Sequence, residues 1–306
     1  MRFVYKALVR MYIFVSQHAE DQWESLLHLF GHEAFEQGDR ENKQEIGPDE
    51  LAHDSNGFQQ QSQNSGSTRF SPVIDIRADS EREQRKGVPE VIFGETKEAG
   101  QIIAMAQALL AGSGRAIISR VRSEAVEVLR ESFSAYEVRV REAARAVVIY
   151  SPDYVHRSTG GQVGVISAGT SDIPVAEEAA LIAEEMGCQV TCIYDVGVAG
   201  LHRLVNPLRD LLARGTDAIV VAAGMDGALP SVVAGLVPVP VIGLPTSIGY
   251  GMGGKGVAAL LAMLQTCAPG LSVVNIDNGV GAGITAAMIA NRVAQARSQA
   301  EGHRSQ

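Results

Sequence analysis

The sequence predicts a three-layer α/β fold built on a parallel sheet, with a smaller α/β domain before it. From about residue 88, short apolar runs alternate with helical periodicity, and five such alternations follow residue 160. Strands as apolar as DAIVVAA (217–223) are typically buried on both faces, and a helix after each strand indicates right-handed parallel crossovers. Hydrophobic residues make up 46% of the 306 residues, which is enough to bury such a core.

The chain divides into three predicted regions. Residues 1–70 are expected to be a poorly defined extension, with one helix over 21–37 and a Gln/Ser-rich polar linker over 55–70. His28 and His32 lie four residues apart on that helix, and we interpret them as surface histidines because no further ligand pattern accompanies them. Residues 71–155 form the smaller α/β domain and residues 156–306 the larger one.

Within the smaller domain, the predicted strands are PEVIFG, RAIISRV and AVVIY, and the predicted helices are TKEAGQIIAMAQALLAG and SEAVEVLRESF, the second with Ser123 as its N-cap. In the larger domain, the strands are QVGVISA, QVTCIYD, DAIVVAA, VPVIGL and LSVVNI. A helical segment follows each of these five strands, and the last one runs through ITAAMIANRVAQA.

Charge and cysteine content exclude several classes of protein. A net charge of −9 provides no positive field for nucleic acid or anionic lipid. The three cysteines form no CxxC pair, which argues against a zinc site or a disulfide framework and favours a reducing cytoplasm. No signal peptide and no membrane span are expected, because Lys6 and Arg10 interrupt the apolar start and no later apolar run is long enough.

The loops between strands and helices carry the candidate binding residues. In a parallel sheet these loops meet at the carboxyl ends of the strands, where ligands bind. Here they are rich in glycine and small hydroxyl side chains, which suits a phosphate-bearing ligand. The five loops are SAGTSD (167–172), DVGVAGLHR (195–203), AAGMDGAL (222–229), PTSIGYGMGGKG (245–256) and NIDNGVGAG (275–283).

Two of these loops allow a simpler interpretation. Ser171 or Asp172 in GTSD could serve only as a helix cap. The segment GYGMGGKG is similar to a P-loop, but Gly256 stands where a Ser or Thr would coordinate Mg²⁺, so an ATPase is not expected. Lys255 could still meet a phosphate or a carboxylate, or the segment could be a flexible lid.

Three residues are candidates for catalysis. His202 follows a glycine-containing loop and could carry a proton near neutral pH, although a structural role is equally open. Asp226 stands in an otherwise apolar loop, where partial burial would raise its pKa; a helix cap is the alternative. Cys188 and Cys192 share one predicted strand as core residues, whereas Cys267 lies in the turn TCAPG after a helix and could act as a nucleophile or be structural.

Taken together, these segments resemble the AIR carboxylase (PurE) family, through SAGTSD, GLHR and AAGMDGALPS. They resemble more closely the LarB family of nickel-pincer nucleotide biosynthesis, through RKGVPEVIFGETK, DVGVAGLHRL, the block from AAGMDGALPS to VVAGLV, YGMGGKG and CAPGLSVVNIDNGVGAG. The resemblance covers residues 85–295. It implies a PurE-like (flavodoxin/Rossmann-like) core and, by analogy with AIR carboxylases, a homo-oligomer.

The LarB resemblance also implies a reaction. Nicotinate adenine dinucleotide would be carboxylated by CO₂ at C5 of its pyridinium ring and cleaved at the phosphoanhydride, with release of AMP. Cys267 would add to the ring, and His202 or Asp226 would accept the C5 proton. No tightly bound cofactor is implied; Mg²⁺ held largely by the substrate is a hypothesis, and its protein ligands are unknown.

The same resemblance assigns the binding residues. Gly169, Thr170 and Ser171 would hold phosphate, Arg203 and Lys255 would neutralise phosphate or carboxylate charge, and Asp172 would contact the ribose or begin a helix.

Three departures from the family patterns matter. PurE enzymes have a serine at the position of Gly169 and a second histidine at Ala228, which argues against purine biosynthesis. LarB proteins usually have Glu at the position of Asp226, so the side chain here is one methylene shorter. The alternatives are an AIR carboxylase or mutase, and a non-catalytic nucleotide-binding module in which Cys267 is inert.

Overall fold

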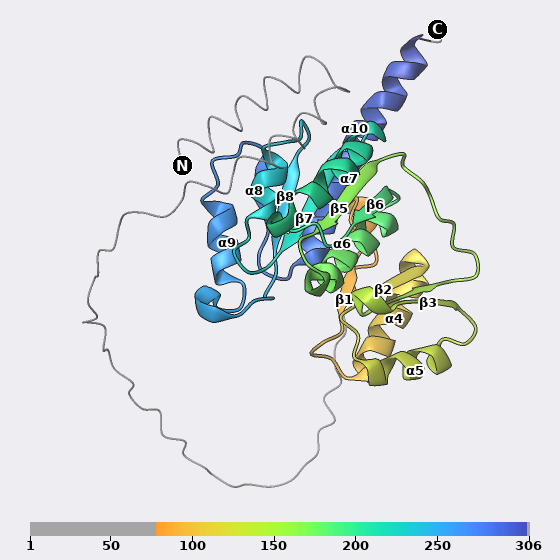
Figure 1. The fold of residues 1–306 in the computed structure, drawn as a ribbon. Helices are drawn as coiled ribbons and strands as arrows, with labels where there is room; N and C mark the ends of the chain where they lie inside the picture. Colours follow the sequence, from red (N-terminus) through yellow and green to blue (C-terminus); the bar gives the residue numbers. More distant parts are fainter. Residues whose placement is uncertain (1–77, 305–306) are drawn as a thin grey trace, which may run out of the picture. The chain divides into compact units, whose positions relative to one another are not determined.

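The computed structural model describes residues 78–304 of the chain, and side chains up to residue 301. The helix expected over 21–37, its two histidines and the polar stretch 55–70 lie outside the described residues. Two sheets are present in the described part, and both belong to one compact unit. Figure 1 shows them with the helices that cover them.

The first sheet is mixed and has the strand order β1-β2-β4-β3. Strands β1 and β2 are parallel, whereas β4 runs antiparallel to both of its neighbours. Helices α4 and α5 cover one face, where Ile102, Leu109 and Leu129 are buried. The elements are α3 (Arg82–Lys86), β1 (Val91–Phe93), α4 (Ala99–Ser113), β2 (Arg115–Ser119), α5 (Ser123–Ser132), β3 (Glu137–Arg141), η1 (Glu142–Ala144) and β4 (Ala146–Tyr150).

Two details of this sheet differ from the sequence prediction. Strand β3 was not predicted, because its sequence EVRVR alternates charged residues with valine instead of forming an apolar run, and none of its residues is fully buried. Ser123 is the first residue of α5, not its cap. The N-cap is Arg122, which makes no side-chain capping hydrogen bond. The predicted serine cap is therefore wrong by one position.

The second sheet is entirely parallel and has the order β6-β5-β7-β8-β9. This confirms the predicted parallel α/β core, and the order is that of flavodoxin-like folds. The elements are β5 (Gln162–Ser167), η2 (Thr170–Asp172), α6 (Ile173–Glu185), β6 (Gln189–Ile193), η3 (Val198–Gly200), α7 (His202–Ala213), β7 (Ala218–Ala223), α8 (Leu229–Ala234), β8 (Val241–Pro245), η4 (Gly251–Gly253), α9 (Val257–Leu264), β9 (Leu271–Val273) and α10 (Gly279–Arg304).

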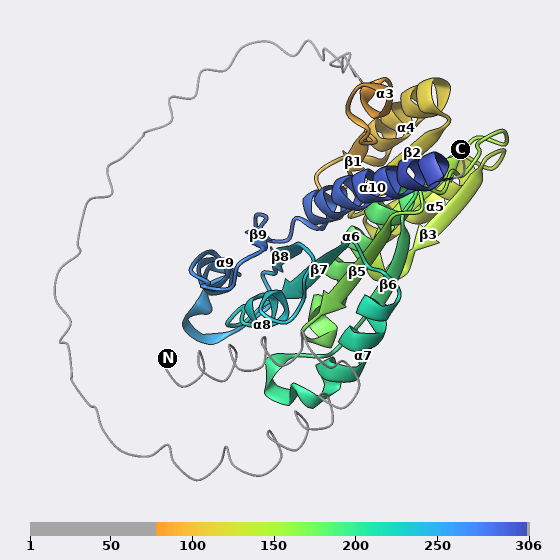
Figure 2. The same cartoon turned by 90° about the horizontal axis from the view of Figure 1, so that it is seen from above.

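Helices cover this sheet on both faces. Val220 of β7 packs in the cluster that contains α6 and α10, whereas its neighbour Val221 packs in the cluster that contains α7, α8 and α9. Successive side chains of a strand point to opposite faces, so the two clusters are the two sides of one sheet. Figure 2 shows α10 beside α6 along one face. The predicted three-layer arrangement is confirmed.

One hydrophobic cluster connects the two sheets. Ile117, Val148 and Tyr150 of the first sheet are buried together with Ala179 and Ile182 of α6. Charged groups border this contact, since the nearly buried Arg115 donates a 2.9 Å hydrogen bond to the carboxylate of Glu185. Helix α6 is therefore covered by the first sheet as well as by the second.

Candidate functional site

The strand order places a topological switch point between β5 and β7. The chain leaves β5 towards α6 on one face of the sheet and leaves β7 towards α8 on the other. At such a switch point the loops diverge, and the space beyond the strand ends is the usual ligand site of parallel α/β proteins. The five predicted loops follow β5, β6, β7, β8 and β9, so all of them lie at the carboxyl edge of this sheet.

Asp172 connects three of these loops. Its carboxylate is 4% exposed. One oxygen accepts a hydrogen bond from the Gly169 amide at 2.9 Å and the other from the Thr246 hydroxyl at 2.6 Å. Burial raises the pKa of the Asp172 carboxyl, although these two donors and the Gly224 amide act in the opposite direction. Both oxygens already have protein partners, so Asp172 holds the loops together. Its bond to the Gly169 amide is also the capping bond of η2, which agrees with the predicted role of Asp172 at a helix start.

Thr246 was not singled out from the sequence, yet it is fully buried at the centre of this arrangement. Its amide donates to the Ala223 carbonyl oxygen at 3.0 Å, which joins the end of β7 to the end of β8. Its own carbonyl oxygen would lie 2.7 Å from a Cβ on Gly256, a residue with φ of +87°. Only glycine therefore suits position 256, and this accounts for the departure from the P-loop pattern.

Thr246→Val should destabilise the protein by about 1–3 kcal/mol at neutral pH, and by less in acid. Without the hydroxyl donor, the folded-state pKa of Asp172 rises further. A carboxyl whose folded pKa lies above its unfolded value makes the unfolding free energy fall as pH rises through that interval. The deficit of the variant relative to wild type should therefore grow only above the folded-state pKa of Asp172 in the wild type, which burial raises above 3.8, and then level off. Urea unfolding at a series of pH values measures it.

Thr216→Val is the matched control for this prediction. The buried Thr216 hydroxyl donates at 2.8 Å to the Leu211 carbonyl oxygen, which does not titrate. Its loss should cost a similar free energy of unfolding at every pH. If the two variants showed the same pH dependence, the buried ionised carboxylate at Asp172 would be excluded as the cause.

The predicted phosphate residues lie at the turn before α6. Thr170 and Ser171 are exposed and belong to the short helix η2, directly ahead of the first residue of α6. Gly169 precedes them, and its amide is occupied by Asp172. The free amides of a helix start and two exposed hydroxyls are suitable donors for an anion. All three residues lie at a helix start, and their binding of phosphate stays a prediction.

His202 and Arg203 begin α7, after β6. The imidazole of His202 is exposed. The guanidinium of Arg203 donates at 2.8 Å to the carboxylate of Asp195, and both side chains are about half exposed. Asp195 has φ of +58° and its amide donates to the Ser167 hydroxyl at 3.3 Å. Arg203 is therefore already neutralised by a carboxylate that the sequence did not identify, and a ligand anion has to compete with Asp195.

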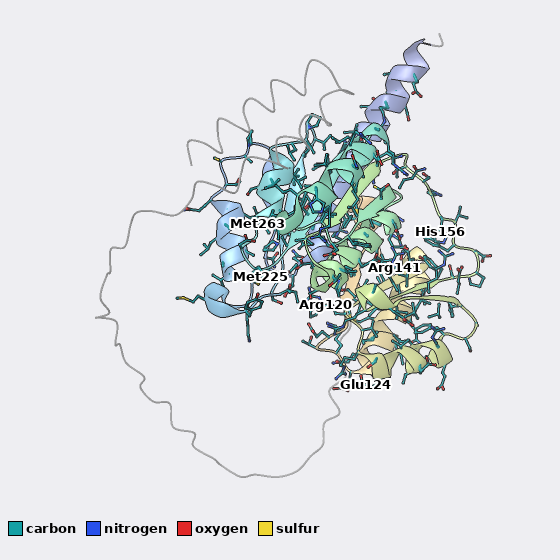
Figure 3. The ribbon with its side chains drawn as sticks, in the orientation of Figure 1. Arg120, Glu124, Arg141, His156, Met225 and Met263 are labelled. Atoms are coloured by element: carbon teal, nitrogen blue, oxygen red, sulfur yellow. The ribbon has the colours of Figure 1, made fainter. Side chains whose placement is uncertain are left out.

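Asp226 lies in the loop after β7. It is exposed, and its carboxylate accepts a 3.4 Å hydrogen bond from the Ala228 amide at the start of α8. The predicted partial burial of this carboxylate is therefore wrong for the single chain, and the local contact is that of a turn. Met225 beside it is also exposed and has φ of +51° (Figure 3).

Lys255 lies in the glycine-rich loop between β8 and α9. Its side chain is exposed and its φ is +39°. The neighbouring residues Gly254 and Gly256 also have positive φ. The loop therefore presents one cation on backbone that L-residues adopt only at a cost.

Cys267 lies at the opposite edge of the sheet. It follows α9 and stands three residues before Gly270, whose carbonyl oxygen accepts a hydrogen bond from Val241 at the first residue of β8. The eight residues of α9 span about 12 Å between this edge and the loops. The thiol is exposed. The structure thus brings the other candidates to one edge and leaves Cys267 apart from them within a single chain.

The other two cysteines behave as predicted for core residues. Cys188 is buried and Cys192 is half-buried. Burial raises the pKa of Cys188 to about 11 and raises the pKa of Cys192 as well. A thiol with a raised pKa is a poor nucleophile at neutral pH.

Within residues 78–301, no cluster of three or more His, Cys, Asp or Glu side chains has the arrangement of a metal site. In the described part of the chain, no helix combines the length and apolar character that crossing a bilayer requires.

The strand order and the glycine-rich loops at the switch point define a PurE-like α/β protein. Residues 162–304 match the protein family described as AIR carboxylase, a class of carboxylase and mutase enzymes. Residues 72–151 match the family described as LarB/PurE-like N-terminal domain. The chain belongs to the LarB family, with an AIR carboxylase-like domain.

Similar proteins fall into two groups. An uncharacterized protein of Methanocaldococcus jannaschii is 41% identical over 218 residues, covering 70% of this chain and 84% of that protein. An N5-carboxyaminoimidazole ribonucleotide mutase of Thermotoga maritima is 33% identical over 135 residues, covering 42% of this chain and 74% of that enzyme. A phosphoribosylaminoimidazole carboxylase of Schizosaccharomyces pombe is 32% identical over 131 residues, covering 42% of this chain and 23% of that enzyme.

Proposed function

We propose that the protein carboxylates nicotinate adenine dinucleotide at pyridinium C5 and hydrolyses its phosphoanhydride. The products are pyridinium-3,5-biscarboxylic acid mononucleotide and AMP. The observation that carries this proposal is the exposed thiol of Cys267, in a chain whose other two cysteines are buried or half-buried. A carboxylase acting on an aminoimidazole has no need of such a thiol, because that ring is already an enamine.

The chemistry requires a nucleophile that can be removed afterwards. A pyridinium ring is electron-poor and does not attack CO₂. Addition of the Cys267 thiolate to the ring carbon beside C5 gives a dihydropyridine, whose C5 is nucleophilic and forms the bond to CO₂. A base then takes the C5 proton, the carbon–sulfur bond breaks, and the thiolate leaves as the ring regains aromaticity. The net change is exchange of one proton for one carboxylate.

We propose that a second copy of the chain completes the site. Within one chain, α9 separates Cys267 from the loops. The same helix exposes an apolar stripe at the spacing of one helix face, formed by Val257, Leu261 and Leu264. Exposed apolar surface of this kind usually marks an interface. A partner seated on α9 would exclude water there and could present its own loops to Cys267, in agreement with a homo-oligomer.

The remaining roles follow from chemistry and position. The helix start at Gly169, Thr170 and Ser171 would bind a substrate phosphate, with Lys255 as the opposing cation. His202 or Asp226 would accept the C5 proton. Both are exposed in the single chain, so either could be enclosed by a second copy.

The same helix start and Lys255 could orient the pyrophosphate for attack by water, which releases AMP and a proton. Arg203 would first have to exchange Asp195 for the ligand. We propose that Asp172 holds the loops in place and takes no part in the chemistry.

An AIR carboxylase or mutase is the second candidate, since the similar mutases and carboxylases carry those names. Gly169 and Ala228 stand where PurE enzymes have a serine and a histidine, and this disfavours the purine substrate. Two incubations separate the candidates: nicotinate adenine dinucleotide with bicarbonate, and aminoimidazole ribonucleotide with bicarbonate.

The first incubation should release AMP and give a mononucleotide heavier by one CO₂ unit, detected by mass spectrometry. Turnover of the aminoimidazole alone would overturn the proposal in favour of the second candidate. Binding of the dinucleotide without any conversion would favour a non-catalytic nucleotide-binding module.

A further inference from the structure

Arg120 extends from the first sheet to the loops of the second. It follows β2 and has φ of +53°, and its guanidinium lies 5.1 Å from the centre of the Phe93 ring. Figure 3 labels Arg120 among the side chains. Its Nε donates at 3.2 Å to Oε1 of Glu178 on α6, and its Nη2 donates to the backbone carbonyl oxygen of Asp277. Although burial opposes its charge, the hydrogen bond and the negative charge of Glu178 raise the pKa of Arg120. The planar guanidinium of Arg120 therefore connects α6 with the loop between β9 and α10.

Asp277 is in turn hydrogen-bonded to the start of the loop that carries Lys255. Its carboxylate accepts a hydrogen bond from the Ser247 amide at 2.8 Å, and its own amide donates to the Pro245 carbonyl oxygen at 2.8 Å. These two bonds hold the chain on both sides of Thr246. The position of the first residues of the glycine-rich loop, which we call its base, thus depends on the position of Asp277.

Glu178 explains why Arg120 is needed. It is 3% exposed, and its Oε1 also accepts a hydrogen bond from the Ser119 hydroxyl. Among the described residues, no donor reaches its Oε2. A Cβ on Gly279 would lie 2.6 Å from that oxygen, so the β9–α10 loop passes directly against the carboxylate. A buried carboxylate is tolerated only when it is paired, and Arg120 is the cation that pairs it.

We infer that Arg120 is a positioning residue, through which the N-terminal domain fixes the base of the loop 246–256 and thereby the place of Lys255. It acts through Asp277 and Ser247. The expected effect of Arg120 on catalysis rests on the proposed function. Its expected effect on the position of the loop 246–256 does not.

Arg120→Ala tests this inference, with Arg141→Ala as the matched control. Arg141 also extends from the first sheet to α6 (Figure 3), where it pairs with Glu177 and Glu184 and not with a residue of the β9–α10 loop. Hydrogen exchange is followed in peptides covering residues 246–256. Exchange there should become at least about tenfold faster in Arg120→Ala and stay within about twofold of wild type in Arg141→Ala.

Kinetics with nicotinate adenine dinucleotide give a second measurement. KM should rise about tenfold in Arg120→Ala, with kcat within about threefold, because the displaced group binds substrate and does not perform the chemistry. Arg120→Lys should recover part of this loss, since the charge stays but the fork that contacts two partners is gone. Arg141→Ala should match wild type in both constants.

A double variant distinguishes loss of the bond to Asp277 from a general loss of folding. Arg120→Met with Glu178→Gln removes both charges, so no unpaired charge stays buried, but the bond to Asp277 is still missing. It should exchange as fast as Arg120→Ala in residues 246–256. Unchanged exchange there in the folded double variant would overturn the inference. If exchange rises but no variant or wild type converts the dinucleotide, the proposed function fails while the positioning role stands.

Discussion

Cys267→Ser should lower the rate of dinucleotide carboxylation by at least about 1,000-fold, because serine has no comparable anionic form at neutral pH and cannot add to the ring. The side chain is exposed, so the free energy of unfolding should change by no more than about 0.5 kcal/mol. Steady-state release of AMP and the carboxylated product measure the effect. Mass spectrometry of the wild-type protein, trapped with substrate, should find an adduct on Cys267.

Cys188→Ala provides the control, because it removes a thiol that is buried away from the loops. Its carboxylation rate should stay within about twofold of wild type. Equal losses in both variants, or no loss in Cys267→Ser, would contradict the nucleophilic role.

Mixing two inactive variants tests whether the site is shared between copies. Cys267→Ser and Lys255→Ala each lack one component. If a site takes the thiol from one copy and the lysine from another, random mixed assembly restores about a quarter of the sites. If both components came from one chain, no mixed oligomer would contain an intact site. Recovery of activity after unfolding and refolding the two variants together therefore supports the shared site, and its absence rejects it.

Gly224→Ala should reduce the carboxylation rate by at least about 100-fold, because about 1 Å of misplacement is enough for such a loss. A Cβ at this position would lie 2.1 Å from the carbonyl oxygen of Ile248 and 2.7 Å from the Thr246 hydroxyl. The first is backbone and cannot rotate away, and the Met225 amide already donates to it at 2.9 Å. The loops after β7 and β8 must therefore separate, and the protein should also lose about 1–3 kcal/mol of unfolding free energy.

Gly100→Ala is the control for the added methyl group. Gly100 lies in α4, and nothing is within 4 Å of the position that its Cβ would take. Alanine favours the helix, so this variant should gain about 0.5–1 kcal/mol in urea unfolding and keep wild-type activity. A Gly224→Ala protein with wild-type rates would show that the two loops do not depend on this close approach.

The sequence was most informative where burial imposes a regular pattern of hydrophobic residues. Val220 and Val221 belong to a run that can only be a strand buried on both faces, and such runs predicted the whole parallel sheet. Strand β3 was not predicted because its sequence EVRVR leaves every residue at least partly exposed. Its pairing with β4 depends on backbone hydrogen bonds, which no side-chain pattern records.

The sequence predicted which loops lie at the candidate site, but not the hydrogen bonds that join these loops. Glycine and hydroxyl residues after each strand identified the loops, but the bonds from Thr246 to Asp172 and from Ser247 to Asp277 join segments 74 and 30 residues apart. The ion pair of Arg203 with Asp195 could not be predicted from the sequence either. The place of Cys267, by contrast, could have been predicted, because a connection from a helix to the next parallel strand always lies at the amino edge of the sheet.

The cluster shared by Ile117, Val148, Tyr150 and α6 makes the two family-matched parts of this chain depend on each other for burial. The two family matches are separated by a short connector, and on that basis they look like modules joined end to end. A gene encoding only the second match would place the outer surface of α6, with its buried Glu178, in contact with water. We therefore expect the AIR carboxylase-like part to be less stable on its own than in the whole chain, unless the outer surface of α6 is redesigned.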